Sequence, residues 1–250
     1  MNYSFVVLVF LLFLLGCNSD PGPAGPERTG PFGEIVGKAS LYSDNGIGLQ
    51  DNSGITVSLE GNSYSTLTKS DGSWKLTEIP AGVYTLVFSK TGFFTIKDYE
   101  VHVVGNDTVN RGSYNFIGQI PNVTFKHISI TGPDSNNYFN INGNISLADS
   151  LLRSAYIIYN KEPISVSSTI ISLMTVYHII QPNSTSFSWR LDYIDSFKKE
   201  YNLSPGSKIY LRVLLRPRAG RAISYNPFNG NVEIYNGQNA LSNLDSLIVP

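Results

Sequence analysis

The sequence predicts an all-β protein with two β-sandwich domains in tandem, which follow a signal peptide and a Pro/Gly-rich spacer. Two observations lead to this fold class. Short runs of β-branched and aromatic residues alternate with polar residues at a period of two, which turns one face of each strand toward a core and the other toward water. Clusters of Gly, Pro, Asn, Asp and Ser separate these runs. The predicted segments are residues 1–16 (signal peptide), 17–32 (cysteine and spacer), 33–117 (first sandwich) and 118–250 (second β-rich domain).

The N-terminal segment predicts export. Residues 5–15 form an unbroken apolar run, which is too short to span hydrocarbon about 30 Å thick but long enough for the apolar part of a signal peptide. Gly16 and Cys17, the only cysteine, follow directly and resemble the lipobox of bacterial lipoproteins. The resemblance implies cleavage before Cys17, a lipid on its thiol, and anchoring in the outer membrane of a Gram-negative bacterium, on its surface or facing the periplasm. The alternative is a buried free cysteine in an N-terminal hydrophobic segment.

Residues 21–27, Pro-Gly-Pro-Ala-Gly-Pro-Glu, are predicted to be a spacer because this composition cannot pack a core. Its two glycines in collagen-like register are too few for a triple helix. In the polyproline form, at about 3.1 Å per residue, residues 18–32 would hold the first domain up to roughly 45 Å from the lipid. Acidic Asp20 resembles the signals that send some Gram-negative lipoproteins to the outer face of the outer membrane.

The composition excludes several classes of function. The formal net charge is −1 and 15% of the residues are charged, so no nucleic-acid partner is expected. With Cys17 lipidated, no thiol remains for a disulfide, a Cys-ligated metal site or a cysteine nucleophile. No later run approaches about eighteen apolar residues. The only membrane contact implied is therefore the lipid, and no cofactor is expected.

The first predicted sandwich shows the alternation most clearly where Ile55, Val57 and Leu59 interleave with polar residues. About seven short strands are expected in this domain. Asp71-Gly72 lies between two of them, and because Gly tolerates a positive φ, this pair predicts a tight hairpin turn. The other predicted strands occupy residues 34–42, 64–70, 74–79, 83–89 and 99–104.

Residues 68–93 contain an Asp-Gly turn, an aromatic-x-Leu strand, the motif Ile-Pro-Ala-Gly-x-Tyr and a Gly-Phe ending. Together these elements resemble the signature of carboxypeptidase regulatory-like domains, which are small transthyretin-like sandwiches. The match covers about residues 33–116. The resemblance implies a turn at Pro80 and Gly82 and no catalytic residues. Related sandwiches include carbohydrate-binding modules, so glycan binding is an expectation by fold analogy. The side chains expected in one core are Trp74, Leu76, Tyr84, Leu86 and Phe88.

The second domain is expected to begin at the interruption 118–121, Gly-Gln-Ile-Pro. Its last strands, at 209–213 and 232–234, distantly resemble a fibronectin-type or immunoglobulin-like pair. Asp192 to Leu203 carries apolar residues at near-helical spacing and predicts one short helix, with Asp192 as its cap. Strands are predicted at residues 123–131, 137–147, 154–160, 169–180, 186–191, 208–216 and 232–235.

Candidate chemistry is sparse. His102, His127 and His178 lie on three different predicted strands without metal-ligand spacing, and no Gly-x-Ser-x-Gly motif occurs. Asp192 and Asp195 are better explained as charges at the start of a helix than as paired catalytic carboxylates. No catalytic residue and no metal ligand is therefore predicted.

Two groups of residues near the C-terminus are candidate binding residues. No Asp or Glu falls between Glu200 and Glu233, so the basic residues there could form a patch for an anionic ligand, or a solvated hairpin paired with carboxylates elsewhere. Aromatic residues nearby could stack on sugar rings, although core or loop packing is the commoner role. The basic residues are Lys208, Arg212, Arg216, Arg218 and Arg221, and the aromatic residues are Tyr225, Phe228 and Tyr235.

These observations favour a non-enzymatic lipoprotein of the cell envelope that displays β-sandwich domains for binding, adhesion or assembly, with an envelope protein or a glycan as partner. One alternative is a carbohydrate-binding accessory subunit of a glycan-uptake system. Another is a hydrolase with unrecognised carboxylates.

Overall fold

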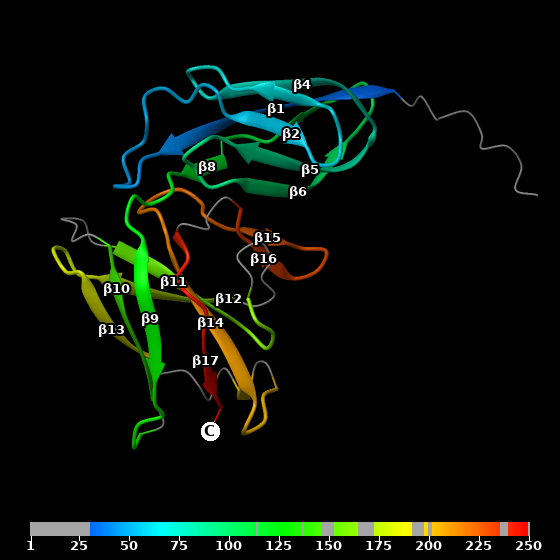
Figure 1. Cartoon of the computed structure of the whole chain (residues 1–250). Coiled ribbons are helices and arrows are strands. Elements are labelled where there is room, and N and C mark those ends of the chain that lie inside the picture. The colour runs from blue at the N-terminus through cyan, green and yellow to red at the C-terminus, as the bar shows by residue number, and fades with distance from the viewer. Residues whose placement is uncertain are drawn as a thin grey trace, which may run out of the picture. The chain divides into compact units, whose positions relative to one another are not determined.

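The computed structural model describes residues 31–250 except 114, 137, 147–152, 165–172, 192–197, 200–201, 236–239 and 250 (Figure 1). The signal peptide, Cys17 and nearly all of the spacer therefore lie outside the described residues. The described part of the chain holds β-strands and almost no helix, so the all-β prediction is confirmed. The short helix expected from Asp192 falls mostly outside the described residues, of which 198–199 are helical. No helix among the described residues is long and apolar enough to cross a membrane.

The first sandwich consists of two sheets. Its β1 runs from Phe32 to Tyr42 and is the centre of one sheet, where it pairs with an antiparallel neighbour and with two short parallel strands that the sequence did not predict. This sheet contains β1, β4 (Ser73–Pro80), β7 (Thr108–Asn110) and β8 (Asn115–Gly118). The second sheet has the order β3 (Ser65–Leu67), β2 (Thr56–Leu59), β5 (Gly82–Ser89), β6 (Ile96–Val103).

The core of the first sandwich lies between these two sheets, as the alternation predicts. Val57 and Phe88 are fully buried, and Trp74 from the facing sheet meets Phe88 edge to face at a centroid distance of 5.6 Å. Tyr84 is partly buried against this cluster, and its hydroxyl donates a hydrogen bond to the Pro80 carbonyl oxygen at 2.8 Å. The same core contains Ile35, Leu41, Ile55, Leu59, Leu76, Ile79, Leu86, Ile96 and Ile117.

The Asp71-Gly72 turn does not join a hairpin, and that prediction is wrong. Gly72 has a φ of +80°, and the Asp71 carboxylate accepts hydrogen bonds from the backbone amide and the hydroxyl of Ser73. The turn is therefore as tight as expected. It carries the chain from β3 in one sheet to β4 in the other, because β4 pairs with β1 and β3 pairs with β2. Local turn chemistry predicts the turn but not the partner of the strand that follows.

The second sandwich has the sheet orders β13-β10-β9 and β12-β11-β14-β17. Ile141 and Ile157, one from each sheet, are fully buried in its core. A separate hairpin of two three-residue strands, β15 and β16, precedes the C-terminal strand. The strand bounds are β9 (Phe125–Thr131), β10 (Phe139–Ile145), β11 (Arg153–Asn160), β12 (Leu173–Ile180), β13 (Ser186–Leu191), β14 (Lys208–Leu215), β15 (Ser224–Asn226), β16 (Asn231–Glu233) and β17 (Asp245–Ile248).

The boundary expected at residues 118–121 lies at the end of β8, which pairs with β1 as far as Gly118. Backbone hydrogen bonds tie this segment in place: the Phe94 amide donates to the Gly118 carbonyl at 3.0 Å, and the Ile120 amide donates to the Gly92 carbonyl at 3.0 Å. The fully buried Phe94 side chain, between β5 and β6, belongs to the core of the second sandwich, although Phe93 and Ile96 beside it in the sequence belong to the core of the first. The two cores therefore meet at this segment.

Candidate functional site

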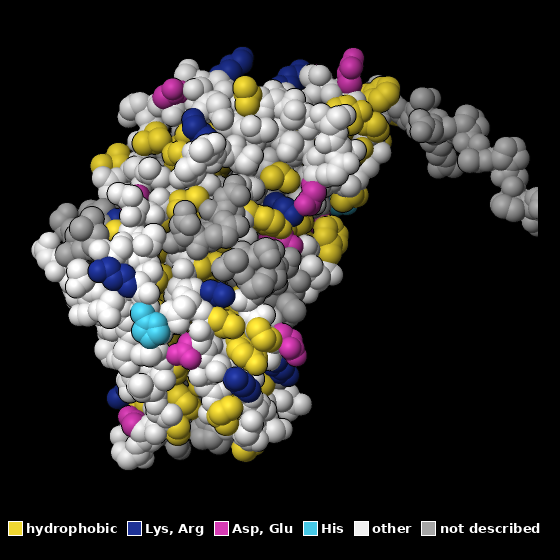
Figure 2. Space-filling model, in the orientation of Figure 1, with side chains coloured by type: hydrophobic (Ala, Val, Ile, Leu, Met, Phe, Trp, Pro, Cys, Tyr) yellow, Lys and Arg dark blue, Asp and Glu magenta, His cyan; other side chains and the backbone are white. Residues whose placement is uncertain are grey.

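The β3–β2–β5–β6 sheet has one face that turns away from the core, which we call the open face. Because side chains alternate across a strand, the buried Val57 and Phe88 place their neighbours in sequence on this face. Leu67 at its edge has 61% of its surface exposed. In Figure 2 the surface over β2 and β5 is mostly white, the colour of uncharged polar side chains and backbone. The register gives the open face two cross-strand rows, Leu67–Thr56–Ser89 and Ser65–Ser58–Val87–Lys97.

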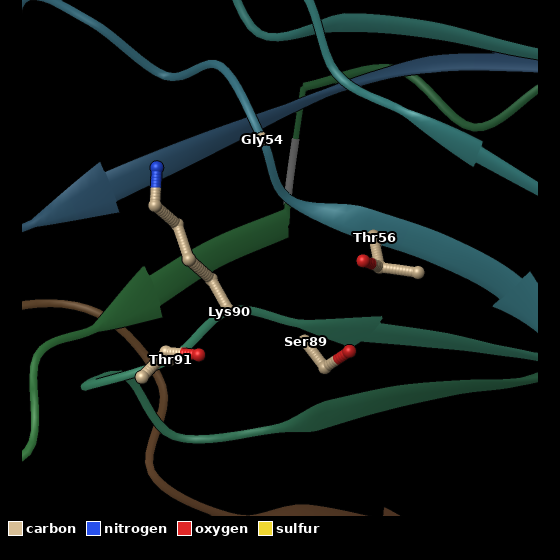
Figure 3. Close-up of a pocket in the computed structure, with 5 residues that line it drawn as sticks. All are labelled: Gly54, Thr56, Ser89, Lys90 and Thr91. Atoms are coloured by element: carbon tan, nitrogen blue, oxygen red, sulfur yellow. The ribbon is translucent and has the colours of Figure 1, made fainter.

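A pocket of about 440 Å³ opens at the first of these rows. Its lining residues come from the start of β2 and the end of β5, and Figure 3 shows Thr56 and Ser89 on neighbouring strands with Lys90 and Thr91 beyond the end of β5. The volume falls in the range of about 300–1,000 Å³ that is usual for small-molecule sites. The lining residues are Gly54, Thr56, Ser89, Lys90 and Thr91.

Buried hydrogen bonds hold the loop before β2, which forms one wall of this pocket. Thr68 is buried, with 5% of its surface exposed. Its hydroxyl donates a hydrogen bond to the Asn52 carbonyl at 2.6 Å and accepts one from the Ile55 amide at 3.0 Å. The Asn52 side chain in turn accepts from the Leu41 amide at 2.7 Å. Gly54, between them, has a φ of +70°, which a residue with a Cβ rarely adopts. The pocket wall is therefore preformed.

Among the residues that the structure describes, Lys90 is the one charged residue that lines the pocket. Its ammonium donates to the Ser53 carbonyl at 2.5 Å. The Asp51 carboxylate accepts from the Ser53 amide at 2.9 Å, and hydrogen bonds from Ser53, with a smaller contribution from the Lys90 charge, lower the pKa of Asp51 below its ordinary value. Both charged groups are thus fixed by Ser53, which lies in the loop before β2.

The other polar side chains of the pocket are hydroxyls without a protein partner in the part of the chain that the structure describes. The side chains of Thr56, Ser89 and Thr91 make no hydrogen bond to another described residue, although Thr56 and Ser89 are half-buried. Each hydroxyl offers one donor and two acceptor positions. The pocket can therefore exchange several hydrogen bonds with a polar ligand at little cost in rearrangement.

The second row of the open face ends in a dense polar cluster around Lys97. The Lys97 ammonium lies 2.5 Å from Glu60 Oε1, 3.7 Å from Glu233 Oε2 and 4.3 Å from the centroid of the Tyr235 ring. Glu233 also accepts hydrogen bonds from the Tyr99 and Tyr235 hydroxyls and, at 3.0 Å, from the Asn226 amide group. This cluster joins β6 to the β15–β16 hairpin, and the Lys97 amide donates to the Ser224 hydroxyl at 2.8 Å.

Glu60 and Glu233 both lie close to the Lys97 ammonium, at 2.5 and 3.7 Å. Two carboxylates near one another could in principle form a catalytic pair. Burial by itself would raise the pKa of Glu233, but hydrogen bonds from Asn226, Tyr235 and Tyr99 and the charge of Lys97 lower it overall. A glycosidase needs one carboxyl group whose pKa is raised so that it can donate a proton. Glu233 is therefore an ionised structural group and not a general acid.

The structure separates the three aromatic residues that were candidates for sugar stacking. Tyr225 and Phe228 are 62% and 64% exposed. Tyr225 lies on the opposite face of β15 from Ser224 and Asn226, which face β6 and Glu233, whereas Phe228 meets the Tyr99 ring edge to face at 6.3 Å. Tyr235 is half-buried and has its hydroxyl on Glu233 and its ring beneath Lys97. The three rings therefore do not form one stacking platform.

The five basic candidates are likewise spread out. Arg212 donates to the Ile164 and Ser242 carbonyls, and Arg221 donates to the Lys97 carbonyl; burial lowers the pKa of both. Arg216 lies over the Tyr156 ring at 5.0 Å. Exposed Arg218 packs its side chain against Gly46, and exposed Lys208 lies 5.0 Å from the Tyr210 ring. At least two of the five cations are thus committed to backbone carbonyls.

The histidines give no sign of a metal site. His102 and His127 are exposed on β6 and β9, and the side chain of His178 on β12 lies outside the described residues. Among the described residues, no three His, Cys, Asp or Glu side chains gather where they could hold a metal ion.

Sequence reasoning missed the pocket residues Thr56, Ser89, Lys90 and Thr91. The period-two pattern assigns Thr56 to the wet face of its strand, but it does not show that Ser89 lies opposite it. That information is in the pairing of β2 with β5, which joins residues about thirty positions apart. The sequence contained one indication of the pocket. The residues that alternate with the buried ones on this face include Thr56, Ser58 and Ser89, which carry hydroxyl groups and no charge.

No protein-family model matches this sequence, and no curated protein is significantly similar to it. Several solved structures resemble the chain. A proposed carbohydrate-binding protein from Bacteroides uniformis is 11% identical, with 88% of this chain and 100% of that chain covered and a TM-score of 0.30. A DUF3823 family protein from Parabacteroides merdae is 13% identical over 85% of this chain and 98% of that chain, with a TM-score of 0.29.

A type II cohesin–X-dockerin complex from Acetivibrio cellulolyticus contains a chain that is 19% identical, with a TM-score of 0.29. That match covers 34% of this chain and 57% of the other, so it spans little more than half of the relative's length. Similarity at this level does not establish a common function.

Proposed function

We propose that this protein is a non-enzymatic glycan-binding protein of the bacterial envelope, held by a lipid on Cys17 and reaching its ligand with the open face of its first sandwich. The membrane anchor follows from the lipobox-like sequence at residues 14–17. The ligand class is supported by the polar lining of the pocket.

The observation that carries the proposal is a preformed pocket whose half-buried hydroxyls, those of Thr56 and Ser89, have no hydrogen-bond partner among the described residues. Pockets for most small molecules are lined mainly by apolar and aromatic side chains with a few polar groups. This pocket is lined by two threonines, a serine, a lysine and a glycine. A ligand rich in hydroxyl groups matches such a surface, because each of its hydroxyls can both donate to and accept from the wall. Exposed Leu67, next to Thr56 in the same row, offers an apolar contact for the C–H groups of a sugar ring.

A binding role is supported further by the state of the nearby carboxylates. Glu233 is buried, ionised and surrounded by four hydrogen-bonding or charged partners, and Glu60 is paired with Lys97. Glu233 accepts three hydrogen bonds and fixes the β15–β16 hairpin against β6. The open face is thus a rigid surface, which reduces the entropy lost when a ligand binds.

The proposal predicts that the full-length protein, purified in detergent, binds glycans on an array and that Thr56→Val combined with Ser89→Ala weakens this binding. Each lost hydrogen bond is worth about 1 kcal/mol, so the double variant should lose roughly 10- to 100-fold in affinity when the array hits are measured by titration calorimetry. Thr77→Val is the matched control, because Thr77 is an exposed threonine on β4 in the other sheet. Absence of binding to every glycan, or equal loss in the control, would refute glycan binding at this pocket.

A further inference from the structure

The pocket on the open face has a cation in its lining. Among the described residues, its lining contains the Lys90 ammonium and no Asp or Glu. Asp51, on the loop before β2, interacts with the Lys90 charge from outside the lining, and its carboxylate accepts a hydrogen bond from the Ser53 amide at 2.9 Å. An ammonium group has three donors, and Lys90 uses one of them on the Ser53 carbonyl at 2.5 Å. Two charged donors therefore remain for a ligand.

The Lys90 side chain also has a defined position, because it is half-buried and its ammonium group is held by the hydrogen bond to Ser53. It passes over Gly54, where an added Cβ would lie 3.7 Å from Nζ. The neighbouring Ser89 and Thr91 supply hydroxyl donors on either side of it along the chain. Figure 3 shows the Lys90 side chain reaching from the end of β5 toward Gly54, with the Ser89 and Thr91 side chains near its backbone. The pocket thus offers a fixed cation at one place and hydroxyl groups at another.

We propose that this pocket selects acidic glycans, in which a carboxylate or a sulfate on the sugar binds the Lys90 ammonium while hydroxyl groups of the sugar hydrogen-bond the hydroxyls that line the pocket. This inference rests on the proposed glycan-binding function and names the substrate class of the same site. A neutral sugar would meet the same hydroxyls but would leave the Lys90 ammonium with weaker neutral acceptors. Because a carboxylate or sulfate adds the attraction between opposite charges to the hydrogen bond that a neutral hydroxyl already accepts from the ammonium, an acidic glycan should bind about tenfold or more tightly than its neutral counterpart.

The test compares acidic oligosaccharides with neutral forms of the same skeleton by titration calorimetry of the full-length protein in detergent. One arm uses uronic-acid oligomers and their methyl esters, and the other uses sulfated oligomers and their desulfated parents. The preference for the charged form is expected in at least one arm, and that arm identifies the carboxylate or the sulfate as the anionic group. The preference should shrink as salt is raised, because salt screens charges at the protein surface.

Two variants at one position make the test specific to Lys90. Lys90→Met and Lys90→Gln should both abolish the preference for the charged form, so that the charged and neutral forms bind equally well; the glutamine retains a donor for Ser53 should the methionine loosen the loop. Lys69→Met is the control, because Lys69 is an exposed lysine outside this pocket. Equal binding of charged and neutral forms, unchanged by either Lys90 variant, would overturn acidic selectivity while leaving glycan binding intact. Failure of all glycans to bind would overturn both.

Discussion

Glu233→Ala should lower the free energy of unfolding by about 3–5 kcal/mol, the usual cost of removing one partner from a buried charged cluster. The Glu233 side chain is 6% exposed and lies 3.7 Å from the Lys97 ammonium. Its removal leaves the Tyr99 and Tyr235 hydroxyls and the Asn226 amide group without their acceptor. Urea denaturation at neutral pH, followed by tryptophan fluorescence, measures the change.

The same substitution makes a prediction about pH. The pKa of Glu233 is lowered from its ordinary value of 4.5 in the folded protein, so its stabilisation is present above that value and is lost as the pH falls through the lowered pKa. The difference in stability between the wild-type protein and the variant should therefore be largest at neutral pH and shrink in acid. Glu162→Ala, at an exposed position, is the control and should change stability little. A loss for Glu233→Ala no larger than for this control would show that the cluster does not fix the hairpin.

Phe88→Ala should also destabilise the protein by about 3–5 kcal/mol, because it leaves a cavity in a close-packed core. Phe88 is fully buried and packs against Trp74 at the centre of the first sandwich. It also separates Val87 from Ser89, whose side chains lie on the open face. Weaker glycan binding should therefore accompany the loss of stability, since the strand that carries Ser89 is held by this side chain.

Phe228→Ala is the control for this second prediction, because Phe228 is 64% exposed and its removal opens no cavity. Its effect on stability should stay within about 0.5 kcal/mol. Thermal unfolding measured by circular dichroism compares the two variants. Similar losses at Phe88 and Phe228 would be inconsistent with a core between the two sheets of the first sandwich.

Much of the fold follows from the sequence, because the side chains of Ile55, Val57 and Leu59 alternate with polar ones over a complete strand. A period of two requires one buried face, and the structure buries these three residues almost completely. The short strands β7, β8, β15 and β17 could not be found in this way, since their sequences lack the full alternation of apolar and polar residues seen at residues 55–59. They form through pairing with distant strands.

The candidate site was harder to predict than the fold for a related reason. Thr56 and Ser89 become neighbours through strand pairing, and Lys90 becomes a fixed cation through a carbonyl oxygen in another loop. Neither relation leaves a local mark in the sequence. The aromatic residues near the C-terminus were chosen as candidates by their residue type alone. In the structure the Tyr235 hydroxyl is hydrogen-bonded to Glu233. Tyr225 and Phe228 lie on different sides of the β15–β16 hairpin.

Nuclear magnetic resonance tests the central claim most directly, by mapping where an acidic oligosaccharide contacts the full-length protein. If the open face is the binding surface, the backbone amide signals of Thr56, Ser89, Lys90 and Thr91 should shift together, in a saturable way, as the oligosaccharide is added. Shifts confined to the β15–β16 hairpin around Tyr225 or to the second sandwich, with the four pocket signals unchanged, would contradict the account.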